Sequence, residues 1–310
     1  MKLTNETVIR EAKAAGFDLV GFAKAEQLTA ETKKLEEWLR KGYQSGMEYM
    51  ERNLDKRKDV RKILPEAKSV ISLGLNYYTN ENYSNEPGKG KVSRYAWGTD
   101  YHLVIWEKLW ILENSLKQID NSFESISYVD TGPVMDKVWA KKAGLGWIGK
   151  HTNLINKEFG SWIFLASIIT NYEFKYSEEI KDFCGSCTAC IEACPTKAIV
   201  SEYVVDSNKC ISNLTIENKG EIPNEFKGKF DNWLFGCDIC QDVCPWNIKF
   251  SQITPLDEFQ PQNGNKEISS EEILSMDEAR FKERFAKSPI KRAKLKGLKR
   301  NARFLNAESF

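Results

Sequence analysis

The sequence has few histidines, no long hydrophobic run and almost no net charge, and each of these narrows what the chain can do. Only 2 of its 310 residues are histidine, so a metal site built from histidines is a poor prediction. No stretch reaches the roughly 18–20 apolar residues that a membrane-spanning helix needs. Residues 1–16 alternate charged and apolar side chains and lack the apolar block of a secretion signal. We therefore expect a cytoplasmic protein.

Nucleotide-binding loops are missing as well. No G-x-G-x-x-G follows the first expected strand, and the glycine-rich residues 144–149 follow an expected helix, so a Rossmann site is poorly supported. No P-loop sequence is present. Lys+Arg number 45 and Asp+Glu 44, so net charge alone does not indicate a polyanionic partner.

Residues 1–175 predict helices that alternate with strands, which is typical of an α/β body. We expect the last two strands, which are separated by a glycine, to form a hairpin. We expect Thr29 to cap the second helix and Pro133 to begin the fourth. The expected helices cover residues 4–15, 29–41, 100–117 and 133–143. The expected strands cover residues 17–23, 69–75, 125–129, 152–155 and 162–170.

The composition changes after residue 175. Residues 176–250 hold all eight cysteines and predict only short elements, whereas residues 251–310 predict a helical and basic end. The predicted fold class is α/β (α+β): a body over residues 1–175, an inserted cluster-binding domain over residues 176–250, and a short helical C-terminal segment over residues 251–310.

The cysteines are poor candidates for disulfides, because the cytoplasm keeps thiols reduced. Four of them have the spacing C-x2-C-x2-C-x3-C before Pro195, which is the bacterial ferredoxin signature. The other four end in C-x2-C-x3-C before Pro245, with their first member displaced upstream by an inserted segment. The two sets are Cys184, Cys187, Cys190 and Cys194, and Cys210, Cys237, Cys240 and Cys244.

This pattern predicts two 4Fe–4S clusters, which form a short path for single electrons toward a site elsewhere in the chain. A pair of zinc sites is the alternative, although structural zinc prefers paired C-x2-C motifs. In ferredoxins the fourth cysteine of each run ligates the other cluster. Crossing the ligands in this way assigns Cys184, Cys187, Cys190 and Cys244 to one cluster and Cys194, Cys210, Cys237 and Cys240 to the other.

Further segments carry a more specific resemblance. They are Ser93-Arg-Tyr-Ala-Trp-Gly98 with Asp100-Tyr-His102, Val129-Asp-Thr-Gly-Pro133, Ala143-Gly-Leu-Gly-Trp-Ile-Gly-Lys150 and Cys210-Ile-Ser-Asn-Leu-Thr-Ile-Glu217. Together, in this order and over nearly the whole chain, they resemble the epoxyqueuosine reductases, a cobalamin-dependent family related to reductive dehalogenases.

The resemblance implies an oxidoreductase that performs the last step of queuosine biosynthesis in tRNA processing. Such an enzyme reduces epoxyqueuosine to queuosine at the wobble position of tRNA, with electrons passing through two 4Fe–4S clusters to cobalamin. The family binds cobalamin without a lower protein ligand, which agrees with the scarcity of histidine. An external low-potential electron donor is needed, and nothing in the sequence demands more than a monomer.

Asp130 is the proton donor that the resemblance implies. It ends an expected strand, and a carboxylic acid in an apolar site keeps its proton near neutral pH. Alternatively, Asp130 caps the helix expected from Pro133. Asp100 is a second family carboxylate, which could instead cap its own helix. His102 resembles the cobalt ligand of the D-x-H-x-x-G motif, but Ile105 occupies the glycine position.

Contacts to cobalamin follow from matching motif positions, several of them through main-chain atoms. The substrate base must leave its stack to reach this pocket, as for other enzymes that act on nucleobases. The predicted cobalamin-binding residues are Asn53, Ser93, Asp130, Leu154, Ser212, Lys219, Cys240 and Gln241.

Residues 280–303 carry eleven Lys or Arg and a single acid, Glu283. Such a run commonly forms only a solvated face, but here it departs from a near-neutral chain, and the resemblance implies an RNA substrate. We therefore predict phosphate contacts. Longer family members continue past the position of Phe310 into a helical-repeat domain. The strength of tRNA binding is therefore not predicted from the resemblance. The predicted tRNA contacts are Lys291, Arg292, Lys294, Lys296, Lys299 and Arg300.

Two other functions are compatible with the cysteines. A reductive dehalogenase for small organic halides would share the cofactors, but it typically carries a twin-arginine export signal and would not use the basic segment. An electron carrier that docks on a partner would need no cobalamin. Cobalt content after growth with cobalamin separates this second alternative from the enzymes.

Overall fold

The computed structural model describes residues 2–84 and 86–306. Its larger sheet has four strands in the order β1-β2-β7-β4, and all neighbouring strands are antiparallel. The body therefore belongs to the α+β class, because a doubly wound α/β body has a mostly parallel sheet. The strands are β1 (Leu19–Lys24), β2 (Ser69–Asn76), β4 (Ser125–Tyr128) and β7 (Ile163–Thr170).

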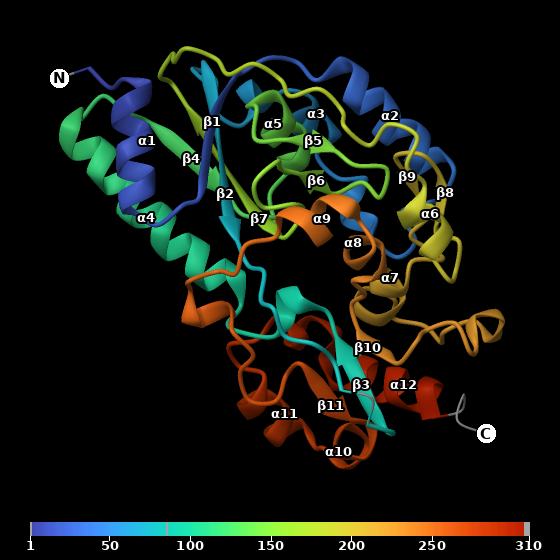
Figure 1. Ribbon diagram of the computed structural model, residues 1–310. Helices are drawn as coiled ribbons and strands as arrows, with labels where there is room; N and C mark the ends of the chain where they lie inside the picture. The colour runs from blue at the N-terminus through green and yellow to red at the C-terminus, as the bar shows by residue number, and fades with distance from the viewer. Residues whose placement is uncertain (1, 85, 307–310) are drawn as a thin grey trace.

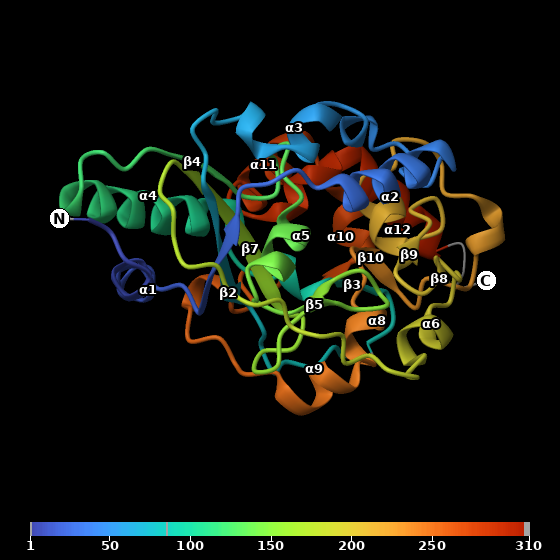
Figure 2. The ribbon, with the colours of Figure 1, turned by 90° about the horizontal axis from the view of Figure 1, so that it is seen from above.

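All eight residues of β2 are buried in the middle of this sheet, and alternate side chains enter different hydrophobic cores. Ile71 packs in the core with α1 (Asn5–Ala14) and α4 (Tyr101–Ile119). Val70 packs in the core on the other face with α5 (Asp136–Lys142). Figures 1 and 2 show α5 on the opposite side of the sheet from α1 and α4.

A second sheet joins distant parts of the chain. β3 (Lys89–Val92) pairs in parallel with β10 (Trp233–Phe235) and antiparallel with β11 (Glu267–Ser269). This sheet lies apart from the larger one in Figure 1 and contributes to a hydrophobic core of its own. The helices beside it are α10 (Ser270–Ser275), α11 (Glu278–Arg284) and α12 (Lys294–Asn306).

The cysteine-bearing part consists of short helices and one two-stranded ladder, and a second such ladder from the body packs against it. Helices of four to six residues are too short to be stable alone, so tertiary packing and ligands must hold them. They are α6 (Ala189–Ala193), α7 (Ile211–Ile216), α8 (Ile239–Asp242) and α9 (Pro245–Phe250). The ladders are β5 (Trp147–Ile148) with β6 (Leu154–Ile155), and β8 (Ile199–Ser201) with β9 (Val204–Val205).

The helices and strands expected for the body are largely confirmed, with three corrections. Residues 152–155 and 162–170 form no hairpin, because β6 pairs with β5 and β7 lies between β2 and β4. The pattern of β7, mostly buried on both faces, is that of a central strand. α5 begins at Asp136 and not at Pro133. Thr29 is the first residue of α2 (Thr29–Arg40) and does not cap it.

The three segments expected from composition share one core. β3 comes from the first segment, β10 from the second and β11 from the third, and all three are in one sheet. The boundaries at residues 175 and 250 stay predictions and do not separate independently packed layers. Among the described residues, α3 (Leu54–Lys58) is a further short helix, and no helix is long and apolar enough to cross a membrane.

Candidate active site

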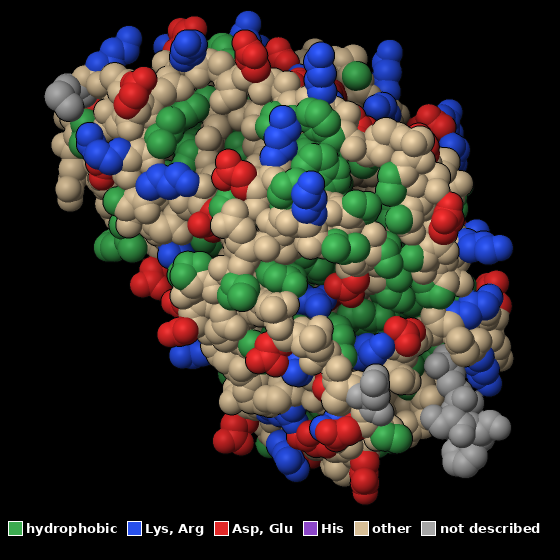
Figure 3. All heavy atoms as spheres, in the orientation of Figure 1, with side chains coloured by type: hydrophobic (Ala, Val, Ile, Leu, Met, Phe, Trp, Pro, Cys, Tyr) green, Lys and Arg blue, Asp and Glu red, His purple; other side chains and the backbone are tan. Residues whose placement is uncertain are grey.

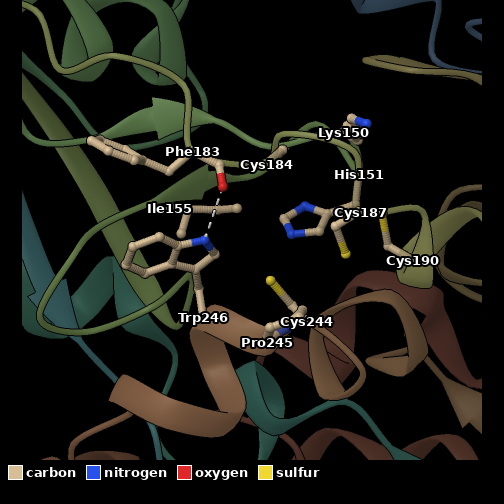
Figure 4. A pocket seen from close by; sticks show the side chains of 10 residues that line it. All are labelled: Lys150, His151, Ile155, Phe183, Cys184, Cys187, Cys190, Cys244, Pro245 and Trp246. Atoms are coloured by element: carbon tan, nitrogen blue, oxygen red, sulfur yellow. Dashed lines mark hydrogen bonds between the residues drawn. The ribbon is translucent and has the colours of Figure 1, made fainter.

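Four cysteines from two distant stretches line one cavity of about 130 Å³. Cys184, Cys187 and Cys190 come from the loop before α6 and from its first turn, and Cys244 immediately precedes α9. Figure 4 shows the sulfurs of Cys187, Cys190 and Cys244 around a common space. The structure thus brings together the four cysteines predicted to share one cluster. None of the eight cysteines forms a disulfide.

The remaining four cysteines form a second, adjoining group. Cys210 precedes α7, Cys194 follows α6, and Cys237 and Cys240 lie on either side of the start of α8. Burial raises the pKa of the Cys240 thiol, and negative charge on Cys210 and Cys194 raises it further. Negative charge on Cys190, a member of the first group, also raises the pKa of Cys240. The two groups of cysteines therefore lie next to each other.

A buried ion-pair network holds α8 against the segment after β3. Asp238 is 1% exposed and accepts hydrogen bonds from the Ser93 hydroxyl and from the backbone N–H of Arg94, the latter at 2.7 Å. The Arg94 guanidinium lies 3.5 Å from Asp238 and 2.7 Å from Asp242. Charges buried in this way need such partners. The hydroxyl of Ser93, predicted to contact cobalamin, is therefore already used by Asp238.

Two side chains of α4 converge on Asp130. The Tyr101 hydroxyl donates to Asp130 Oδ2 at 2.9 Å, and His102 Nε2 lies 3.8 Å from the same oxygen. Asp130 has a φ of 56°, a strained value for a residue other than glycine. Two expectations are wrong: the side chain is 67% exposed rather than enclosed in an apolar site, and it caps no helix, because α5 begins at Asp136.

Asp100 orients His102. Its Oδ1 accepts the backbone N–H of His102 as the N-cap of α4 and lies 2.8 Å from His102 Nδ1. Its Oδ2 lies 2.9 Å from Lys291 Nζ. Burial raises the pKa of Asp100, but the hydrogen bonds from His102 and Lys291 outweigh it and bring the pKa to about 2. The capping alternative is confirmed, and an ionised Asp100 is no proton donor near neutral pH.

Lys137 links this carboxylate site to the cysteines. From the first turn of α5, its Nζ donates to the Thr152 carbonyl at 3.2 Å and to Asn153 Oδ1 at 2.8 Å. Lys137 is exposed to solvent, yet desolvation by the neighbouring protein atoms lowers its pKa, whereas the negative charges of Asp130 and Cys240 act in the opposite direction. The ammonium is therefore within electrostatic reach of both, at the junction of the body and the cysteine-bearing part.

A second acid adjoins Asp130. Burial raises the pKa of Asp136 to about 7, against the hydrogen bond that Ser167 donates to its Oδ1 at 2.6 Å. The charge of Asp130 adds to the rise, and that of Arg57 opposes it. A proton is thus held near neutral pH at the start of α5.

The basic segment reaches the edge of the site. Lys291 contacts Asp100, as described above, and Arg292 donates two hydrogen bonds to Glu217 at 2.9 and 3.0 Å while lying over the ring of Tyr49. On the face in Figure 3, acidic and basic side chains are interspersed, in keeping with the near-neutral composition. The two cations nearest the site are therefore partly neutralised within the protein.

α12 presents Lys294 and Lys296 to solvent and Lys299 in part. Arg300 is a correction to the predicted tRNA contacts, because it is only 8% exposed and its guanidinium is used inside the protein. It clamps α12 onto the chain that follows α7. Its acceptors are the backbone carbonyls of Leu214, Asn218 and Gly220 and the side chain of Asn301.

The remaining residues predicted to contact cobalamin differ in exposure. Asn53 and Lys219 are exposed, Ser212 is half-buried in α7, and Leu154 is buried in β6. Gln241 is buried, and its side-chain amide donates to the backbone carbonyl and the hydroxyl of Ser161, so this amide is already used within the protein.

Comparison with known proteins settles the family. Residues 57–131 match a family model described as "Epoxyqueuosine reductase QueG, DUF1730", and residues 183–247 match a "4Fe-4S double cluster binding domain" that spans all eight cysteines. An epoxyqueuosine reductase of Leadbetterella byssophila is 49% identical over 295 residues, which is 95% of each chain. The chain belongs to the epoxyqueuosine reductase family.

Solved structures of epoxyqueuosine reductases have the same fold. One with an epoxyqueuosine-modified tRNA-Tyr stem loop superposes with a TM-score of 0.92 at 35% identity, covering 98% of this chain and 80% of that one. Another, from Bacillus subtilis with its catalytic aspartate loop swung out of the active site, gives 0.91 at 34% identity and covers 98% and 81%. The predicted fold class is thereby confirmed.

Several site residues of this epoxyqueuosine reductase family member were not singled out by sequence. Tyr101 lies inside the Asp100-Tyr-His102 motif, which was the available signal, whereas nothing in the sequence points to Lys137. Asn213 is buried, and both polar atoms of its side chain lack a hydrogen-bond partner in the described structure. Such an amide beside Cys210 fits a bound group with its own donors and acceptors.

Proposed function

We propose that this protein reduces epoxyqueuosine to queuosine at the wobble position of tRNA, using two 4Fe–4S clusters and cobalamin, with Asp130 as the proton donor. The observation that carries the proposal is the arrangement around Asp130. Its carboxylate is exposed and accepts a hydrogen bond from Tyr101. It lies within electrostatic reach of Lys137, on which Cys240 also acts, and of Arg292 in the basic segment.

Removal of an epoxide oxygen as water consumes two electrons and two protons. When bound, the clusters supply single electrons and cobalamin supplies a low-valent cobalt centre beside the substrate. The side chains of this protein must therefore hold the base, place a proton at the departing oxygen and restore that proton. Asp130 is the exposed acid that can reach a substrate from the mouth of the site.

His102 is placed to restore the proton of Asp130. The ionised Asp100 accepts from Nδ1, so that Nε2 is the nitrogen turned toward Asp130. A proton held at Nε2 is then 3.8 Å from the Asp130 carboxylate. The Tyr101 hydroxyl fixes the same carboxylate oxygen, so the acid is held in place before a substrate arrives.

The junction between body and cysteine groups suits cobalamin, a cofactor rich in amide groups. The unpartnered amide of Asn213 offers both a donor and an acceptor there. The neighbouring Ser212, together with Lys219 and Asn53, would complete contacts to the corrin side chains, while Cys240 and Gln241 would contribute main-chain atoms.

Five exposed or partly exposed cations would contact the RNA phosphates. The two nearest the site, Lys291 and Arg292, would exchange protein partners for phosphates, because a fully charged phosphate competes well for an exposed cation. We further propose that the enzyme acts as a monomer in the cytoplasm with an external low-potential electron donor. The other proposed phosphate contacts are Lys294, Lys296 and Lys299.

Anaerobic turnover tests the proposal. Protein reconstituted with both clusters and cobalamin is given a strong reductant and tRNA carrying epoxyqueuosine, and the digested nucleosides are read by mass spectrometry. We expect the wobble nucleoside to lose one oxygen. Asp130→Asn should lower the rate roughly 10²–10⁴-fold. Asp120→Asn, which alters a partly exposed carboxylate at the far end of α4, serves as the control.

Two results would contradict the proposal separately. An unchanged nucleoside with fully loaded wild-type protein would reject the substrate. Wild-type turnover by Asp130→Asn, with product formed, would reject Asp130 as the proton donor and leave the substrate standing.

A further inference from the structure

His151 lies in the wall of the first cysteine cavity with one ring nitrogen unused. The residue is 4% exposed and lines the cavity together with Cys184, Cys187, Cys190 and Cys244. Figure 4 shows its imidazole projecting among the sulfurs. Nε2 is buried and has no hydrogen-bond partner in the described structure.

The protonated nitrogen of His151 is defined by its other contact. Nδ1 accepts the backbone N–H of Asn153 at 3.2 Å, so Nδ1 carries a lone pair and the proton of the neutral ring is on Nε2. The ring therefore presents a buried N–H to the cavity. A buried donor without an acceptor costs free energy, which favours an acceptor supplied by whatever fills the cavity.

The other side chains with N–H groups in the wall of the cavity have acceptors within the protein. Lys150 Nζ donates to the Gly185 carbonyl at 2.7 Å and pairs with Glu202 at 2.7 Å. Trp246 Nε1 donates to the Phe183 carbonyl at 3.4 Å, the dashed line in Figure 4. His151 is thus the lining side chain whose ring N–H has no acceptor at all, whereas two of the three ammonium hydrogens of Lys150 are used within the protein.

We propose that His151 Nε2–H donates a hydrogen bond to a sulfur of the 4Fe–4S cluster held by the four cysteines of this cavity, and thereby raises the reduction potential of that cluster. The inference rests on the proposed cluster ligation. His151 acts as a positioning residue and not as a ligand, because the four thiolates already complete the ligand set. A hydrogen bond to cluster sulfur stabilises the reduced form, which carries one more negative charge.

The scarcity of histidine makes a direct spectroscopic test simple. The chain has two histidines, so protein labelled with ¹⁵N-histidine and loaded with both clusters carries labelled nitrogen at His102 and His151 alone. Pulsed EPR of the reduced protein should detect a weak ¹⁵N coupling. The coupling should vanish in His151→Phe and persist in the matched control His102→Phe.

Potentiometric titration followed by EPR supplies the second readout. His151→Phe should move one of the two clusters to a more negative potential and leave the other unchanged. His151→Gln, which retains a side-chain N–H, should restore part of the shift, and His102→Phe should produce none. Iron and sulfide analyses verify that each variant holds both clusters.

Three outcomes would overturn the inference: no ¹⁵N coupling in the wild-type protein, unchanged potentials in a fully loaded His151→Phe protein, or a coupling as strong as that of a directly coordinated nitrogen. If His151→Phe loses a cluster, the inference is still tested by the ¹⁵N coupling in the labelled wild-type protein and by the cluster potentials of His151→Gln. Neither readout involves tRNA or cobalamin, so a failure of the substrate proposal would leave the result interpretable.

Discussion

His102 Nε2 lies 3.8 Å from Asp130 Oδ2, with no other partner for this nitrogen in the described structure. The two residues come from different elements, α4 and the loop after β4, and meet because β4 pairs with β7 in the sheet that α4 covers. The ionised Asp100 holds the opposite nitrogen of the ring. This geometry gives Asp130 a neighbour from which a proton can be replaced.

The first prediction concerns that neighbour. His102→Gln should lower kcat by roughly 10²-fold, the lower end of what general acid–base groups contribute, and should change KM little. The reason is that the substitution removes the imidazole nitrogen that faces Asp130 and leaves access to the site unchanged. Steady-state rates on epoxyqueuosine-containing tRNA measure both constants. An unchanged kcat would show that Asp130 recovers its proton from solvent.

The second prediction tests the crossed cluster ligands. Cys244→Ala should remove the same cluster as Cys187→Ala, although Cys244 is close in sequence to Cys240. Each of these two variants should retain one cluster, and EPR-monitored titration should give the remaining cluster the same reduction potential in both. Cys237→Ala should leave a survivor with a different potential. If Cys244→Ala matched Cys237→Ala instead, the crossed assignment would be wrong.

A third prediction separates two cations of one helix. Arg300→Met should lower the melting temperature, because each buried carbonyl left without its donor costs about 1–3 kcal/mol. Lys296→Met should leave the melting temperature unchanged and reduce the salt dependence of tRNA binding by about one phosphate contact. Thermal unfolding and binding at several salt concentrations measure the two effects. The prediction would be wrong if Lys296→Met lowered the melting temperature and Arg300→Met changed only the salt dependence of tRNA binding.

The fourth prediction concerns pH. The folded-state pKa of Asp136 is about 7 against an ordinary value of 3.8, so the folded protein binds the proton more tightly than the unfolded chain. The stability that this group contributes is complete below about pH 3.8 and is lost as the pH rises through 7. Asp136→Asn should therefore be more stabilising, relative to wild type, at pH 8 than at pH 6.

Asp120→Asn is the matched control for this experiment. Hydrogen bonds from Tyr172 and Ser122 lower the pKa of Asp120 to about 2, so it stays ionised throughout the range and its effect should be the same at pH 6 and pH 8. Denaturant titrations at the two pH values provide the comparison. Equal effects of Asp136→Asn at both values would mean that Asp136 is ionised throughout.

Local sequence predicted the parts of the protein that local chemistry determines. The cysteine spacing is a property of single loops, so the grouping of Cys184, Cys187 and Cys190 needed no knowledge of the fold. Asp130 was located by its motif at a strand end. Its exposure was not predicted, because burial depends on which elements cover the loop.

Tertiary contacts explain what was missed. Arg300 belongs to a basic run, but α12 turns it onto the carbonyls of a segment some eighty residues earlier, and no charge count reveals that. β7 was paired with its sequence neighbour, whereas its real partners are β2 and β4. His151 lies in a glycine-rich motif whose chemistry emerges only when Cys244 joins the cavity.

The parallel pairing of β3 with β10 constrains how the chain can be made and divided. The partners of β3 are β10, about 140 residues later, and β11, which follows β10. This sheet can therefore form completely only after most of the chain has left the ribosome. The iron–sulfur segment is consequently not a detachable ferredoxin. A gene fragment ending near residue 250 would leave one edge of β3 unpaired, and such an edge promotes aggregation.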